Sequence, residues 1–155
     1  MNSRLLAFLV VSLPVLIGGV LFGPFAFDLV THRRPPDRIL IPAGYTGWVR
    51  VDFGVESAPG LPREQRRLLI PLQLNGTLKT STRRPDGFGK DEYFYVSGDS
   101  RNPLSTSGVC KGGMIWGLET GSNIDGSSFE RFFVGSEDQF RHEIDPAGKN
   151  FSACE

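Results

Sequence analysis

The chain has 155 residues, of which 22% are charged and 39% hydrophobic, a composition typical of a folded protein. Once a targeting segment is set aside, this length leaves room for one domain, so a second domain is not expected. The 17 basic and 17 acidic side chains cancel, and a neutral chain lacks the positive field that attracts nucleic acid. We therefore expect no nucleic-acid partner.

Residues 1–28 form the predicted membrane anchor. Residues 5–27 are 23 consecutive residues without a charge, and at about 1.5 Å per residue such a helix crosses a hydrocarbon core of roughly 30 Å. The alternative is a cleaved signal peptide, but the apolar run is longer than a usual signal core. In addition, Pro24 stands two residues before the candidate cleavage point after Ala26. The sequence favours an uncleaved, single-pass anchor.

The orientation of this anchor has two competing indicators. Arg4 precedes the apolar run and three arginines soon follow it, a count that by itself would place the domain in the cytoplasm. An anchor at the extreme N-terminus, however, normally translocates the domain that follows it. We therefore expect an extracytoplasmic domain, periplasmic or at the cell surface, and keep the cytoplasmic topology as an alternative.

An all-β domain is predicted at residues 38–145, after a spacer at residues 29–37 that Pro35 and Pro36 keep extended. Within residues 48–55, Val49, Val51 and Phe53 alternate with polar positions, as in a half-buried strand. Residues 146–155 are a C-terminal tail. The other predicted strands are residues 38–41, 68–74, 77–80, 92–96, 114–118 and 129–134.

Two local signals refine this prediction. Asn75-Gly76 between the apolar runs 68–74 and 77–80 predicts a tight β-hairpin with a type I′ turn. Near the end of the domain, Ser136 and Gln139 form a capping box that begins a short helix, which Pro146 ends. Short strands at this spacing favour a small β-sandwich with one C-terminal helix.

Signals for catalysis or for a cofactor are weak. His32 and His142 are the two histidines, too few for a zinc site, and we predict no metal and no cofactor. Asp91 and Glu92 are adjacent on a strand, so they point to opposite faces and are interpreted as salt-bridge partners or as charges that protect a sheet edge, rather than as a catalytic pair. The arginines at positions 63, 66, 67, 83 and 84 are interpreted as solvated charge.

Aromatic residues beside charges give the candidate ligand-binding residues Trp48, Tyr93 and Tyr95, the first beside Arg50 and Asp52. Such a platform suits a protein, peptide or glycan, because the rings bind with little loss of entropy. The alternative is that a second sheet or loop covers them. Trp116, between Met114 and Leu118 on its face, is predicted to lie in the core.

The two cysteines, Cys110 and Cys154, form a possible disulfide. It would close a loop of more than about 40 residues and stabilise the fold by about 3–4 kcal/mol in an oxidising compartment. The alternative is two unrelated buried thiols.

Four blocks of the sequence resemble a known family. They are I-P-A-G-Y-T-G-W-V at residues 41–49, K-D-E-Y-F-Y-V at 90–96, G-G-M-I-W-G at 112–117 and E-R-F-F-V-G at 130–135. The chain resembles an uncharacterised bacterial family of short exported or membrane-anchored proteins, a domain of unknown function. The resemblance spans roughly residues 38–141 and implies an extracytoplasmic domain without an assigned activity. This chain has no lipoprotein cysteine near its apolar run, so the helix alone would attach it.

Two functions follow as hypotheses. The first is a membrane-tethered, non-enzymatic binding or envelope-accessory module. The second is an extracytoplasmic hydrolase that uses Asp or Glu side chains that are not adjacent in sequence. The strand order also resembles transthyretin-like or carboxypeptidase-regulatory-like sandwiches, an analogy of architecture that says little about function.

Overall fold

The computed structural model describes residues 34–85, 87 and 89–147. The chain divides into two compact units, Met1–Arg34 with Asp86–Phe88, and Pro35–Pro85 with Gly89–Glu155, and the elements below belong to the second. In order they are β1 (Arg38–Pro42), β2 (Gly47–Phe53), β3 (Arg63–Glu64), β4 (Arg67–Pro71), β5 (Thr77–Thr80), β6 (Glu92–Ser97), β7 (Ser100–Pro103), β8 (Ile115–Ser122), β9 (Ser128–Val134) and α2 (Glu137–Ile144).

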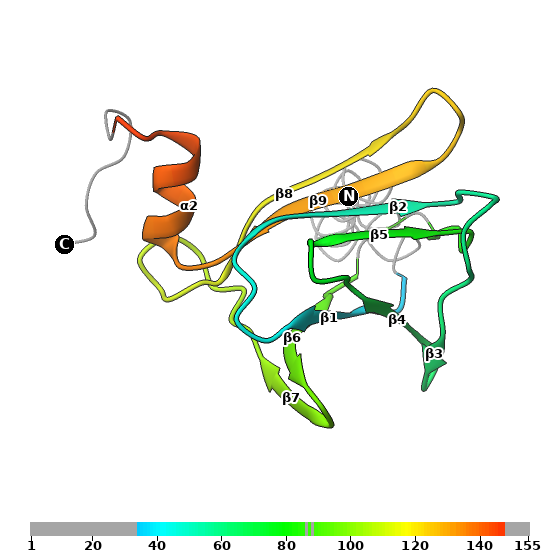
Figure 1. Cartoon of the computed structure of the whole chain (residues 1–155), viewed down its shortest axis with the longest axis horizontal. Coiled ribbons are helices and arrows are strands. Elements are labelled where there is room, and N and C mark those ends of the chain that lie inside the picture. Colours follow the sequence, from blue (N-terminus) through cyan, green and yellow to red (C-terminus); the bar gives the residue numbers. More distant parts are fainter. Residues whose placement is uncertain (1–33, 86, 88, 148–155) are drawn as a thin grey trace, which may run out of the picture. The chain divides into compact units, whose positions relative to one another are not determined.

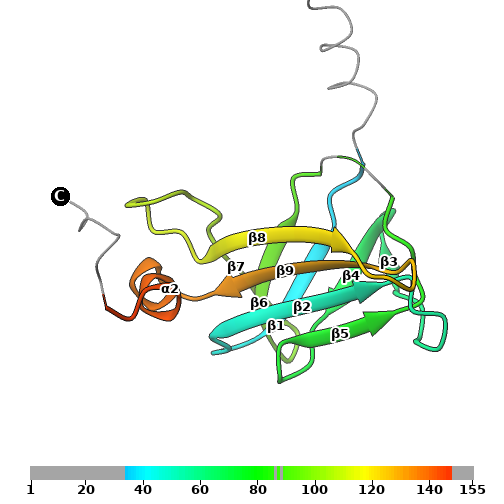
Figure 2. The same ribbon diagram turned by 90° about the horizontal axis from the view of Figure 1, so that it is seen from above.

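The strands form two sheets (Figure 1), which confirms the predicted all-β fold with one short helix. One sheet has the order β3-β4-β1-β6-β7 and the other has the order β5-β2-β9-β8. Both are mixed, because β1 runs parallel to β4 and β6, and β2 runs parallel to β5. Figure 2 shows β8, β9, β2 and β5 side by side in one layer, with α2 following the end of β9.

The core consists of alternate residues from strands of both sheets. Val49, Val51 and Phe53 of β2 are buried, as their alternation predicts. Ile39 and Ile41 of β1 are fully buried in the same apolar cluster. Burial of these apolar side chains is the main favourable contribution to folding, at about 25 cal/mol per Å².

The predicted hairpin at Asn75-Gly76 is wrong. β4 pairs with β1, whose Leu40 carbonyl also accepts a hydrogen bond from the Leu72 amide, whereas β5 pairs with β2 of the other sheet. Gly76 has φ +75° and Asn75 does not share the left-handed conformation, so the turn is not type I′. A Cβ at Gly76 would lie 1.9 Å from the Tyr45 hydroxyl. The turn therefore carries the chain from one sheet to the other.

The end of the domain largely follows the prediction. Ser136 caps α2, and the capping box with Gln139 is complete. β8 continues to Ser122, beyond its predicted end, after a bulge between Trp116 and Glu119 where Gly117 has φ +59°.

None of the helices in the described part of the chain has the length and apolar character needed to cross a membrane. The predicted anchor, residues 1–28, lies outside the described residues.

Candidate binding surface

The three aromatic residues predicted to bind a ligand do not lie together. Trp48 belongs to β2 of the four-stranded sheet, whereas Tyr93 and Tyr95 belong to β6 of the five-stranded sheet. Tyr93 is 5% exposed and meets Phe132 edge-on, with ring centroids 5.2 Å apart. The Tyr95 hydroxyl donates to the Tyr45 backbone oxygen at 2.6 Å, and burial raises the Tyr95 pKa. The two tyrosines occupy the face of β6 that packs against the core, so they do not form one surface with Trp48, and a ligand-binding role for the three residues stays a prediction.

Trp48 lies on the outer face of the four-stranded sheet, as predicted, and is half-buried there. Its ring meets Phe133 and Phe140 edge-on, with centroids 5.7 and 6.1 Å away. The guanidinium carbon of Arg131 lies 3.9 Å from the centroid of the Trp48 ring. Trp48 therefore supports the fold through two rings and also holds an arginine at the surface.

The same arrangement is repeated along the outer face. Arg50 lies over the ring of Phe129, with its guanidinium carbon 4.4 Å from the centroid. Phe129 itself lies across Gly121 of β8, where a Cβ would be 2.7 Å from the ring. We call Trp48, Arg50, Phe129 and Arg131 the arginine–aromatic face.

Charge on this face is arranged in an unusual way. Arg50 of β2 stands directly opposite Arg131 of β9, a pairing of like charges that destabilises a sheet. Asp52 accepts from Arg50 at 2.9 Å, and Glu119 lies 3.9 Å from Arg131. The two arginine side chains remain 43% and 41% exposed. Arg50 also donates from Nη2 to Asn123 at 3.2 Å. The exposed part of each guanidinium can donate to carboxylate, carbonyl or hydroxyl oxygens of a partner.

Helix α2 closes one end of the face. The ring of Phe140 stacks on that of Trp116, with centroids 5.9 Å apart and planes at 11°. Trp116 is buried, as predicted, and its indole N–H donates to the Gly135 backbone oxygen at 2.9 Å. Gly117 leaves room for this contact, because a Cβ there would lie 3.1 Å from Phe140. The stacked rings fix the helix against the sheet.

A second polar group is buried between the sheets. Arg84 donates from Nε to Asp37 at 2.9 Å, from Nη2 to Asp91 at 2.6 Å, and from Nη1 to Glu130. The side chains are 11%, 5%, 7% and 3% exposed for Arg84, Asp37, Asp91 and Glu130. The interpretation of Arg84 as solvated charge is therefore wrong, while that of Asp91 as a salt-bridge partner is confirmed. We call these four residues the Arg84 cluster.

This cluster bears on the hydrolase hypothesis. Three carboxylates that are distant in sequence converge, as that hypothesis requires. Each, however, accepts a hydrogen bond from Arg84, and burial removes their side chains from solvent. A carboxylate pair that cleaves a substrate needs access to both substrate and water. The arrangement is that of a structural ion-pair cluster.

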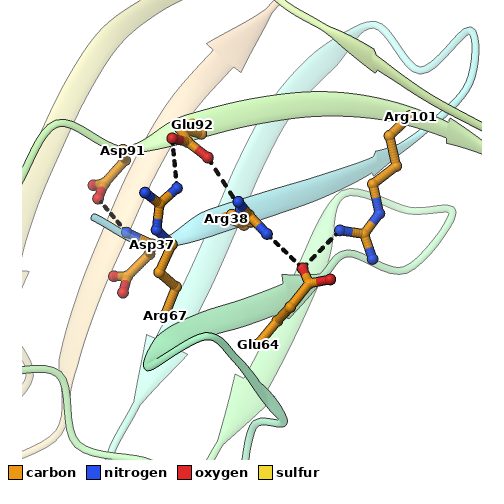
Figure 3. A network of polar contacts seen from close by, with 7 residues as sticks. All are labelled: Asp37, Arg38, Glu64, Arg67, Asp91, Glu92 and Arg101. Atoms are coloured by element: carbon orange, nitrogen blue, oxygen red, sulfur yellow. Dashed lines mark hydrogen bonds and ion pairs between the residues drawn. The ribbon is translucent and has the colours of Figure 1, made fainter. Parts of the chain in front are cut away.

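A third group lies on the outer face of the five-stranded sheet (Figure 3). Glu92 accepts from Arg38 at 3.0 Å and from Arg67 at 2.6 Å, and Glu64 accepts from Arg38 at 2.6 Å and from Arg101 at 2.8 Å. These bonds lower the pKa of both glutamates. β3 and β7 are opposite edges of this sheet, so the Arg101–Glu64 bond requires the sheet to curl. We call these five residues the outer network.

The hairpin that joins β3 to β4 is strained. Its two central residues, Gln65 and Arg66, have φ of 48° and 69°, as in a type I′ turn, although neither is Gly, Asn or Asp. Arg63 and Arg66 are exposed, and Arg63 donates to the Arg66 backbone oxygen at 3.4 Å. Such backbone conformations cost of order 1–3 kcal/mol each. No local signal in the sequence marks this turn.

Cys110 is disulfide-bonded, and its backbone N–H donates to Glu137 at 2.6 Å. Its predicted partner, Cys154, lies outside the described residues, so the pairing stays a prediction. Within residues 34–85, 87 and 89–147, no group of three or more His, Cys, Asp or Glu residues is arranged to hold a metal ion.

The comparisons with known proteins agree with this description. The model of a family of unknown function, DUF6843, matches residues 33–143. The chain belongs to this family. A search of curated proteins finds no match. Among solved structures, the chain is similar to the 2.75 Å crystal structure of a "putative lipoprotein" from Bacillus anthracis. The two are 23% identical with a TM-score of 0.54, over 79% of this chain and 85% of that one. At that identity the likeness shows a shared fold.

Proposed function

We propose that this DUF6843 protein is a membrane-tethered, extracytoplasmic binding module without enzymatic activity, whose partner contacts the arginine–aromatic face. The partner is a protein, a peptide or a glycan. The name of the Bacillus anthracis structure supports a place at the bacterial cell envelope. The uncharged run at residues 5–27 supports attachment by a helix.

One observation carries this proposal: two half-exposed guanidinium groups are held over aromatic rings on an open sheet face. Ring stacking reduces the freedom of each arginine, so less entropy is lost when its N–H groups bind a partner. Arginine and aromatic residues are enriched where protein partners bind. The directly opposed Arg50 and Arg131 cost sheet stability, which a partner with carboxylate or hydroxyl oxygens would repay.

Site-specific photo-crosslinking of the full chain in its native host tests the proposal. A photoreactive residue replaces Lys79 or Glu119, two exposed positions on this outer face, or Arg101 on the other sheet as the control. We expect one recurrent adduct with a protein, peptide or glycan from the first two positions and no such adduct from Arg101. Adducts of equal yield from all three positions would contradict a defined binding face.

A matched pair of substitutions then tests the arginine chemistry. Arg131→Gln should reduce adduct yield at least tenfold, whereas Arg67→Gln on the other sheet should leave it unchanged. Both arginines are partly exposed, so each change should alter the free energy of unfolding by about 1 kcal/mol or less. Loss of the adduct with both variants would indicate a general effect on folding instead.

The location has separate tests. The full chain should stay in the membrane fraction after carbonate extraction, and a compartment-sensitive reporter fused after Glu155 should report an extracytoplasmic position.

We also propose that the finer fold type is a transthyretin-like or carboxypeptidase-regulatory-like sandwich. Comparing the strand order of each sheet with the strand orders of those two folds tests this.

A further inference from the structure

The strained β3–β4 hairpin is a basic, exposed feature of the five-stranded sheet. Arg63 and Arg66 project from it, and the outer network beside it adds Arg38, Arg67 and Arg101. These five arginines outnumber the two glutamates of the outer network, Glu64 and Glu92, by three. The adjoining Arg84 cluster holds three carboxylates and one arginine, so the excess over both groups is one positive charge. Because the Arg84 cluster is buried, the charge exposed at the hairpin itself is that of Arg63 and Arg66.

The opposite end of the domain carries the opposite charge. Four carboxylates and one arginine lie on or beside α2, which lies across the molecule from β3 in both ribbon views (Figures 1 and 2). They are Glu137, Asp138, Glu143, Asp145 and Arg141. An anionic surface would attract the hairpin end and repel the helix end, so the charge distribution gives the domain a preferred orientation.

The strand register places the hairpin where the chain enters the domain. β1 begins at Arg38, directly after the spacer, and Arg38 lies level with Leu69 of the parallel strand β4. Arg66 precedes Leu69 by three residues, so the hairpin tip extends about 10 Å beyond the start of β1. It extends from the edge of the domain that is joined to the predicted anchor.

The spacer limits how far this edge can move from the bilayer. Residues 29–37 number nine, and a fully extended chain spans at most about 3.3–3.6 Å per residue, or roughly 30 Å. A tether of this length gives a high effective concentration of headgroups, so weak attraction suffices for docking. Each basic residue near an anionic bilayer increases the equilibrium constant for membrane binding about fivefold.

We propose that the β3–β4 hairpin binds the anionic phospholipid headgroups of the bilayer that holds the anchor. This contact rests on the proposed membrane tether and adds a second attachment to it. Guanidinium groups suit this role, because their planar N–H groups pair with phosphate oxygens. The strained turn fits as well, because an Asn-Gly turn would be easier to form but would lack the charge that Arg66 presents at the tip.

Arginine footprinting of the full chain in lipid nanodiscs tests the proposal. Discs of phosphatidylcholine alone are compared with discs that contain about 30% phosphatidylglycerol, and phenylglyoxal labelling is read by mass spectrometry at each arginine. We expect labelling of Arg63 and Arg66 to slow several-fold in the anionic discs and to recover in 0.5 M NaCl, where screening is strong. Arg50, on the other sheet, serves as the internal control and should not change.

Two variants of Arg66 separate charge from shape. Arg66→Gly suits the left-handed backbone, so it should raise the urea midpoint of unfolding while reducing the protection of Arg63 about fivefold. Arg66→Lys keeps the charge and should keep the protection. Full protection in Arg66→Gly, or equal labelling in both disc types, would overturn the proposal. Protection by soluble polyphosphate but not by phosphatidylglycerol would likewise overturn the lipid assignment.

The same experiment distinguishes the two proposals. A chain that does not enter nanodiscs of either composition lacks the anchor, and both the tethered function and this contact fail. A chain that enters both but shows no lipid-dependent protection loses only the hairpin contact.

Discussion

Arginine–carboxylate pairs occur in two places in this domain, and the two places differ mainly in their access to water. In the Arg84 cluster, one guanidinium bonds three carboxylates between the sheets, and all four side chains are nearly inaccessible. In the outer network, three arginines and two glutamates bond across an open sheet face. The geometry of single pairs is similar, so burial should decide how much each contributes.

The largest expected effect is from Arg84. Arg84→Met removes the cation shared by three buried carboxylates, and removal of one partner from a buried ion pair costs about 3–5 kcal/mol. Urea unfolding of the full chain in detergent micelles measures this, because both tryptophans, Trp48 and Trp116, lie in the domain and report on it alone. Arg83→Met, one residue away and exposed, is the control and should change the free energy of unfolding by less than about 0.5 kcal/mol. Equal effects of the two changes would mean that burial does not distinguish them.

A comparison of these two groups also shows which structural features a local sequence pattern can predict. The two faces of β2 and the capping box of α2 follow from residues within one element, and both were predicted. The opposite orientation of Asp91 and Glu92 also follows from the alternation of a strand. The members of the Arg84 cluster come from positions 37, 84, 91 and 130, and no local pattern relates them.

The features that were missed or wrongly predicted have the same origin. Asn75-Gly76 specifies a turn, but long-range packing decides which strands pair with each other. β4 and β5, which flank this turn, pair with strands of different sheets. The alternation of side chains along β6 places Tyr93 and Phe94 on opposite faces of the sheet, but it does not indicate which of the two faces meets the core. The left-handed Gln65 and Arg66 give no sequence signal, because neither residue type is typical of that conformation. On the candidate surface, Trp48 was predicted, but its stacking with Arg131 depends on the pairing of β2 with β9.

A smaller effect is expected within the outer network. A double-mutant cycle of Arg67→Gln and Glu92→Gln should give a coupling free energy of about 0.2–1 kcal/mol, because the pair is partly exposed and loses side-chain entropy on forming. Urea unfolding of the two single variants and the double variant supplies the value. A coupling near that of a buried pair would show that the curled sheet shields the network from water.

Acid should weaken the outer network. Hydrogen bonds from arginines lower the folded-state pKa of Glu64 and Glu92 below the usual value of 4.5. The stability that these groups contribute is therefore present above about pH 4.5 and is lost as the pH falls through their lowered values. The double variant Glu64→Gln with Glu92→Gln should show a shallower fall in urea midpoint between pH 5 and pH 3 than the parent. A parallel fall in both would assign acid sensitivity to other groups.

The smallest expected effect concerns Arg101, at the exposed edge of the outer network. Arg101→Gln should lower the urea midpoint slightly at low salt, because its bond to Glu64 joins two side chains that are each 38% exposed. At 1 M NaCl the Debye length is about 3 Å, so this difference should disappear. The effect of Arg84→Met should persist under the same conditions, because ions do not reach a buried pair. A difference for Arg101→Gln that survives high salt would mean that the side chain acts by packing its hydrocarbon stem rather than by its charge.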